Sequence, residues 1–224
     1  MMTAVRRTIL LLLLLTPALG AGDFRDAKRA FREAFEPEAS PEARLAAVRT
    51  LSAHDGKDAA KLLLSGIPVS EAILDDLTER RARIAGGDVK GLPDGDPLPA
   101  LSELKEEVVA EMRVLEAIEE AVAGMTSEKA RTYLLRDALF KEKSWRARRL
   151  AAEIAGAGGD EDAAKYLLRA LRDRDARVKI AVALALGKLG AEEAREDLAD
   201  LLDEDAWTVR AAAVDALAEI GGVE

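Results

Sequence analysis

A stripe of apolar positions recurs with a period of 31 residues in the last third of the chain. Each stripe has apolar residues at i, i+3, i+4, i+7, i+8 and i+11, a spacing that forms one face of an α-helix. The stripes consist of Ala147, Leu150, Ala151, Ile154, Ala155 and Gly158, then Val178, Ala181, Val182, Ala185, Leu186 and Leu189, then Val209, Ala212, Ala213, Ala216, Leu217 and Ile220. This repetition predicts a solenoid, because each unit buries its apolar face only against its neighbours.

Shorter helices and acidic turns are expected before these stripes. Residues 161–171 and 192–202 each predict a shorter helix, and Thr126 or Ser127 can cap a third that runs to Phe140. The turns 173–175 and 203–205 supply carboxylates that can accept from the free N–H groups of the next helix. Gly190 and Gly221 are expected in the left-handed conformation that stops a helix.

This unit resembles a HEAT repeat: a short helix, an Asp-containing turn, and Val-Lys or Val-Arg opening an alanine-rich helix that ends in Leu-Gly or Ile-Gly. Its 31-residue length is similar to that of the short subclass first associated with phycobilisome lyases. The residues that carry the resemblance are Asp175, Val178, Lys179, Ala181, Ala185, Leu186 and Gly190, and Asp205, Val209, Arg210, Ala212, Ala216, Leu217 and Gly221. It covers three units within residues 126–224. It implies an all-α, right-handed α-solenoid of helical pairs, a fold whose members are mostly interaction scaffolds.

The N-terminal half fits the repeat less well. Residues 21–66 are interpreted as a degenerate first repeat, in which Ser40 caps a helix that begins at Pro41 and a short helix follows over 57–64. Residues 67–125 predict a long helical hairpin inserted in the solenoid, which interrupts or braces it. Its first helix is expected over 70–85 and its second from Pro99 or Ser102 to about Gly124, with a glycine- and proline-rich loop over 86–99 between them.

Residues 1–20 have the organisation of a secretory signal peptide. Arg6 and Arg7 precede an apolar run that is too short to span a bilayer, and small residues follow it. Cleavage is expected after Gly20, with cleavage after Ala21, twin-arginine export and an uncleaved anchor as alternatives. The mature chain is therefore expected to be exported to the periplasm or the extracellular space, with no membrane span after cleavage.

Composition excludes several kinds of chemistry. The net charge of −9 argues against nucleic acid as a partner. No cysteine and a single histidine exclude thiol nucleophiles and multi-histidine metal sites, including the iron site of the HEAT-like deoxyhypusine hydroxylases. His54 is interpreted as a half-buried residue at a helix end, and residues 94–96 lack the further ligands of a calcium loop. No catalytic, cofactor-binding or metal-binding residue is predicted, and no cofactor is expected.

The candidate binding surface is the concave side, which the second helix of each unit lines in HEAT-type stacks. The predicted surface consists of Arg148, Arg149, Glu153, Lys179, Ile180, Leu184, Lys188, Arg210, Val214 and Asp215. Two structural alternatives stay open: packing between repeats can bury the apolar members, and the basic residues 148, 179 and 210 can pair with turn carboxylates of neighbouring repeats. Trp145 and Trp207 are expected to pack between repeats rather than to bind a ligand.

The sequence therefore predicts a non-enzymatic scaffold of the cell envelope or the secreted space that binds protein partners. A structural subunit that self-associates through its ends or its hairpin is one alternative. A small-ligand carrier or an enzyme is another.

Overall fold

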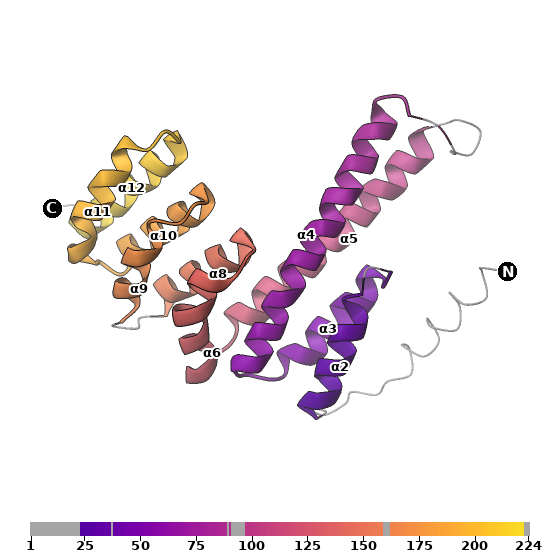
Figure 1. Cartoon of the computed structure of the whole chain (residues 1–224), viewed down its shortest axis with the longest axis horizontal. Helices are drawn as coiled ribbons and strands as arrows, with labels where there is room; N and C mark the ends of the chain where they lie inside the picture. The colour runs from indigo at the N-terminus through magenta and orange to yellow at the C-terminus, as the bar shows by residue number, and fades with distance from the viewer. Residues whose placement is uncertain (1–22, 37, 89, 91–96, 159–161, 222–224) are drawn as a thin grey trace.

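The computed structural model describes residues 23–36, 38–88, 90, 97–158 and 162–221, so residues 1–20, for which a signal peptide is predicted, and residues 94–96 lie outside the described residues. Every regular element of the described part is a helix. The helices form pairs that stack side by side along the chain (Figure 1). The pairs are α2 (Phe24–Ala34) with α3 (Pro41–Ser52); α4 (Lys57–Ala85) with α5 (Pro97–Ala123); α6 (Glu128–Tyr133), η2 (Leu134–Ala138) and α7 (Leu139–Lys141) with α8 (Trp145–Ala157); α9 (Ala163–Ala170) with α10 (Ala176–Lys188); and η3 (Glu192–Ala194), α11 (Arg195–Asp200) and η4 (Leu201–Asp203) with α12 (Trp207–Gly221).

Polar residues fix where the second helices begin. Ser40, Ser144 and Asp175 are the N-caps of α3, α8 and α10, and each side chain accepts a hydrogen bond from a backbone N–H of the first turn. These bonds satisfy donors that have no partner within the helix. Of the two predicted caps, Thr126 and Ser127, the structure shows Ser127 as the N-cap of α6, and a π-helical segment continues this helix to Lys141.

Neighbouring second helices approach closely at glycine. A Cβ added to Gly156 would lie 2.8 Å from the Cα of Ala185, and one added to Gly187 would lie 2.8 Å from the Cα of Ala216. These two glycines let α8, α10 and α12 pack at short range, and the apolar stripes form the core between them. The predicted stack of helical pairs is confirmed in this region.

The long helix α4 contradicts the expected break before residue 70. One helix of 29 residues covers both the short helix 57–64 and the helix 70–85, with Pro68 inside it, and the expected boundary at residue 66 falls within it. Proline removes one backbone hydrogen bond and costs roughly 3 kcal/mol in a helix interior. Leu63, Leu64 and Ile67 are fully buried on this turn, and their burial offsets that cost.

The hairpin of α4 and α5 is a member of the stack with elongated helices. Its lower half lies between the first pair and α8, because α5 packs against α3 and α4 packs against α6 (Figure 1). Residues 111–123 of α5 match the 13-residue length of α8, and the rest of the hairpin projects beyond the stack. The hairpin is therefore an extended helical pair rather than an insertion between pairs. Helix α5 also begins at Pro97, so the end of the expected 86–99 loop is helical.

Gly190 and Gly221 were both expected to stop helices in the left-handed conformation, but only Gly190 does so. Gly190 has a φ of 61°, the left-handed conformation predicted for it. Gly221 is instead the last residue of α12, which corrects the second prediction. The repeat pattern places a glycine there, but nothing in the described chain turns back after it.

Candidate functional site

A ladder of basic residues connects neighbouring helical pairs. The fourth residue of each regular second helix is basic: Arg44 in α3, Arg148 in α8, Lys179 in α10 and Arg210 in α12. Three of the four form an ion pair with a carboxylate of the next pair along the stack. This arrangement confirms pairing between repeats for Arg148 and Lys179.

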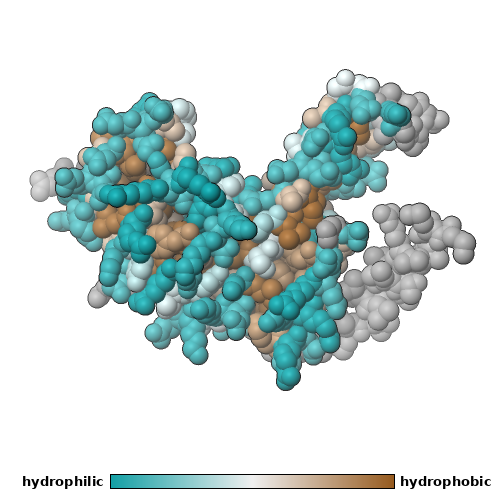
Figure 2. Space-filling view, in the orientation of Figure 1, coloured by the Kyte–Doolittle hydropathy of each residue, from teal (hydrophilic) through white to brown (hydrophobic). Residues whose placement is uncertain are grey.

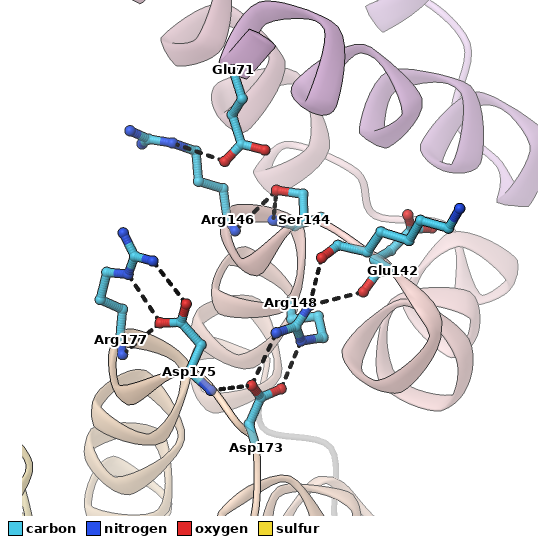
Figure 3. A network of polar contacts seen from close by, with 10 residues as sticks. Glu71, Glu142, Ser144, Arg146, Arg148, Asp173, Asp175 and Arg177 are labelled. Carbon is cyan, nitrogen blue, oxygen red and sulfur yellow. Dashed lines mark hydrogen bonds and ion pairs between the residues drawn. The ribbon is translucent and has the colours of Figure 1, made fainter. Parts of the chain in front are cut away.

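Arg148 shows the full geometry of one such contact between neighbouring pairs (Figure 3). Its Nη1 donates to the carbonyl oxygens of Glu142 and Lys143, both at 2.9 Å, which holds the guanidinium over the preceding turn. Its Nε and Nη2 donate to the two carboxylate oxygens of Asp173 at 2.6 and 3.0 Å. Such a bidentate pair is stronger and more specific than a single contact. Arg148 is buried, so it is not an exposed member of a docking surface.

Lys179 and Arg44 make the equivalent ion pairs with other carboxylates. Lys179 Nζ pairs with Glu204, which lies in the turn before α12. Arg44 Nη1 donates to the carbonyl of Ala39 at 2.7 Å, and its Nε and Nη2 donate to Glu111 Oε2 at 3.2 and 2.6 Å. Glu111 belongs to α5, so a helix side chain takes the place of a turn carboxylate here.

Arg210 has the same orientation without a carboxylate. Its Nη1 donates to the carbonyl oxygens of Glu204 and Asp205 at 2.7 and 2.8 Å, as Arg148 does to its own turn. Within the described residues, Arg210 makes no ion pair, and its side chain is exposed. Its Nη1 is therefore held by its own turn as that of Arg148 is, and no described carboxylate pairs with it.

Trp145 and Trp207 occupy equivalent positions, but among the described residues only Trp145 is contacted by a residue of the next pair. The Arg177 guanidinium lies 3.5 Å from the ring centroid of Trp145, a cation–π contact between α8 and α10. Trp145 therefore packs between repeats, as predicted. Trp207, two periods later, is 70% exposed, so the prediction is wrong for this residue. No described helix lies beyond α12 to cover it.

The other predicted surface residues divide into structural and exposed groups. Arg149 bridges Glu119 of α5 and Glu153 at 2.9 and 2.8 Å, and Ile180 and Leu184 are half-buried against the core. The exposed members are Glu153, Lys188, Arg210, Val214 and Asp215. Three of these five lie on α12, so the structure gathers the accessible part of the predicted surface at the end of the stack.

Helix α5 carries an exposed apolar surface, where the hairpin leaves the stack, that the sequence analysis did not identify. Val109 and Met112 on α5 are 41% and 49% exposed, while Leu77 and Leu104 fill the seam with α4. Figure 2 shows hydrophobic surface along this part of the hairpin. The sequence contains a signal for this surface, because the spacing of the buried Leu104, Leu115 and Ile118 leaves Val109 and Met112 on another side of α5.

A groove of about 560 Å³ lies between α3 and α5, beside this stripe. Leu45, Val48 and Ala117 supply its apolar lining, and Arg113 and Glu116 supply charges of both signs. The groove is open to solvent, so it is suited to a side chain or a peptide segment of a partner rather than to an enclosed small ligand.

Asp55 fixes the turn at the base of this groove. Its Oδ2 accepts from the backbone N–H groups of Thr126 and Ser127 at 2.9 and 2.8 Å and from the Thr126 hydroxyl at 2.9 Å. Burial opposes the charged form, but these hydrogen bonds outweigh it and lower the pKa of the Asp55 carboxyl. The ionised carboxylate thus connects the α3–α4 turn to the α5–α6 turn.

His54 lies two residues after the end of α3, close to the helix end at which it was expected. Its ring meets Phe24 edge to face, with the centroids 5.4 Å apart, and it is half-buried. In the described part of the chain, no group of three metal-ligating side chains comes together. None of the described helices is long and apolar enough to cross a membrane.

This geometry defines an all-α solenoid whose pairs are connected by a ladder of ion pairs. Residues 132–218 match the family of HEAT repeats, which supports the resemblance for the C-terminal pairs. No curated protein matches the chain.

Proposed function

We propose that this protein is a non-enzymatic scaffold that binds another protein through the projecting hairpin, and that it acts in the cell envelope or outside the cell. The observation that carries the proposal is the pair of exposed apolar side chains Val109 and Met112 on α5, at the level where the hairpin leaves the stack. HEAT-type stacks commonly bind other proteins along extended surfaces, and the match over residues 132–218 supports this class of function.

The hairpin is suited to binding because its own helices hold it in place. Leu77 and Leu104 pack between α4 and α5, and Arg80 on α4 lies 4.0 Å from Glu107 on α5. A partner therefore meets an ordered surface and does not have to order it, which lowers the entropic cost of association. The groove beside the stripe carries Arg113 and Glu116, so the partner segment combines apolar residues with charges of both signs.

Site-directed photo-crosslinking in native extract tests this proposal. A photoreactive residue at position 109 or 112 is expected to crosslink to a protein other than this chain, and Val109→Asp combined with Met112→Asp is expected to abolish complex formation. Glu103 is the matched control position, because it is exposed on another side of α5. Equal crosslinking at 103, 109 and 112 would contradict binding through the stripe.

Export is tested separately. Expression of the full chain in a host with a general secretory pathway is expected to give a secreted or periplasmic product that begins at Ala21, as measured by intact mass. A cytoplasmic product that retains residues 1–20 would contradict export and would leave the binding test unaffected.

A further inference from the structure

The outer face of the last helical pair has the features of a stacking interface. Leu202 is 38% exposed and Val214 is 54% exposed, whereas their counterparts 31 residues earlier, Leu171 and Ala183, are 3% and 0% exposed. The following pair buries those counterparts. No described helix lies against the outer face of α12, so the same positions remain open there.

The first pair leaves the opposite face of the stack open. Ala43 and Ala46 on α3 are half-buried and Thr50 is exposed, whereas the corresponding residues of α10, Val178, Ala181 and Ala185, are buried. The preceding helix α8 covers α10, and within the described residues no helix precedes α2. The two ends of the stack thus expose the two sides of one kind of contact.

The ion-pair ladder also leaves one open group at each end. Glu38 lies three residues before α3 begins, as Asp173 precedes α10 and Glu204 precedes α12. Asp173 and Glu204 pair with the basic residue of the preceding unit, and Glu38 is an exposed counterpart for which the described residues show no such pair. Arg210, held by its own turn, offers the matching donors at the other end.

The first helices of the end pairs carry opposite charge. Residues 192–203 include six carboxylates and one arginine, whereas α2 has four basic and two acidic side chains. The exposed basic residues of α2 are Arg25 and Arg29, which pair with Asp23 and Asp26, and Arg32, which makes no ion pair within the described residues. First helices of neighbouring pairs lie on the same side of the stack (Figure 1), so stacking end on end brings these opposite charges together.

Side-chain sizes at the two ends differ from those at the joints within the chain: they are larger on α12, smaller at Ala43 and larger at Thr50. Trp207, Val214 and Ala218 are larger than Ala176, Ala183 and Gly187, which precede them by one period. On the other end, Ala43 is smaller than its counterpart Val178. Ala218 and Thr50 prevent the close approach that Gly187 allows, so the joint between two copies has a wider spacing than the joints within one chain.

We infer that the protein associates head to tail, with the α2–α3 pair of a second copy docked on the α11–α12 pair and Glu38 of that copy bound by Arg210. This contact joins different surfaces of the two copies, so it generates an open chain or a ring rather than a closed dimer. Only one helical pair contributes on each side, so we expect weak association, with a Kd on the order of 10–100 μM. The hairpin lies outside the contact, so end-to-end association and partner binding can each fail without the other.

Sedimentation velocity of the chain from Ala21 to Glu224 tests the inference. The weight-average mass is expected to rise with concentration between about 1 and 500 μM. Val214→Glu blocks one end and Ala46→Glu blocks the other, so each variant alone is expected to be monomeric. A mixture of the two has one intact pair of ends, and it is expected to form a dimer and nothing larger. A contact of α12 with itself would instead leave Ala46→Glu fully associated.

The ladder contact is tested by charge exchange. Arg210→Glu and Glu38→Arg are each expected to weaken association about 3- to 10-fold, and the double variant is expected to restore it. Lys188→Glu and Val109→Glu are controls outside the contact and are expected to associate as the wild type does. A monomeric wild type throughout the range, a mixture that forms no dimer, or loss of association through Val109→Glu would overturn the inference. Circular dichroism confirms that each variant is folded.

Discussion

The buried pair of Arg44 and Glu111 gives the most decisive test of how the extended hairpin is held in the stack. Glu111→Gln keeps the size of the side chain and removes its charge, while Arg44 stays charged in a site where the side chain is only 3% exposed. Breaking a buried pair on one side costs about 3–5 kcal/mol, because the remaining charge has lost its compensation. We therefore expect a loss of that order for the first pair and its contact with α5.

Urea unfolding followed by two signals locates the effect. Far-UV circular dichroism reports all helices, whereas both tryptophans, at positions 145 and 207, lie in later pairs of the stack. In a stack that is stabilised mainly between neighbours, Glu111→Gln is expected to shift the first part of the circular dichroism transition to lower urea, ahead of the fluorescence change.

Two further variants make the reasoning refutable. Glu107→Gln, one turn earlier on α5, removes an exposed pair with Arg80 at 4.0 Å and is expected to change stability by less than about 0.5 kcal/mol. The double variant Arg44→Met, Glu111→Met removes both charges and is expected to return to within about 1 kcal/mol of the wild type. If Glu111→Gln behaves like Glu107→Gln, the buried pair does not hold the first unit to the hairpin.

Three further predictions concern the joints between later pairs. Gly187→Ala is expected to lower the free energy of unfolding by about 1–3 kcal/mol in the same urea assay, because the added Cβ would lie 2.8 Å from the Ala216 Cα. Gly221→Ala is the control: its Cβ would meet nothing within 4 Å, so it is expected to be neutral or stabilising. Trp145→Ala is expected to lower the free energy of unfolding by about 1–2 kcal/mol, because it removes packing and the contact with Arg177. Trp207→Ala in dilute monomer is expected to change the free energy of unfolding by less than about 0.5 kcal/mol, because Trp207 is exposed. Equal effects of the two substitutions would contradict the different roles of the two tryptophans. Asp175→Ala is expected to lower the free energy of unfolding by about 1 kcal/mol at neutral pH and by less below a pH of about 4, as measured by thermal unfolding across pH. A loss of stability that does not change with pH would contradict a role for the Asp175 carboxylate in capping α10.

The sign of the pH effect follows from the hydrogen bonds of Asp175. The Arg177 guanidinium and backbone N–H donate to this carboxylate and hold its pKa below the ordinary value, although burial opposes them. A lowered pKa in the folded state stabilises the protein above the unfolded pKa, and this contribution is lost as the pH falls through the lowered value. Arg177 is half exposed, so solvent screens the pair and keeps the effect small.

The sequence predicted those features that depend on local spacing. The period of 31 residues predicted the pairs of the C-terminal half, and Ser40, Ser127 and Asp175 have the cap roles expected of them. It also offered the ladder of Arg148 and Lys179 as an alternative to a binding surface, and the ladder is what forms. These features follow from helix geometry and from contacts between adjacent units, which a repeat pattern encodes directly.

The sequence did not predict those features that depend on distant contacts. The break expected between residues 64 and 70 does not occur, because burial of Leu63, Leu64 and Ile67 keeps α4 continuous through Pro68. Equivalent positions in the repeat predicted equal roles for Trp145 and Trp207, whereas burial depends on whether another pair follows. A periodic pattern contains no information about which of its units is covered by another described helix.

Glu111 shows how the stack accommodates a pair of unusual length. In the regular units the turn between the two helices lies at the level of the preceding basic residue, so a turn carboxylate can reach it. Elongation of α4 and α5 moves the end of the hairpin away from α3, the helix that contains Arg44 (Figure 1). A buried arginine still requires a carboxylate, because its desolvation is otherwise uncompensated. Glu111, at the level where a regular second helix would begin, supplies that carboxylate from the helix itself. The hairpin can therefore project from the stack without breaking the ladder that connects its neighbours.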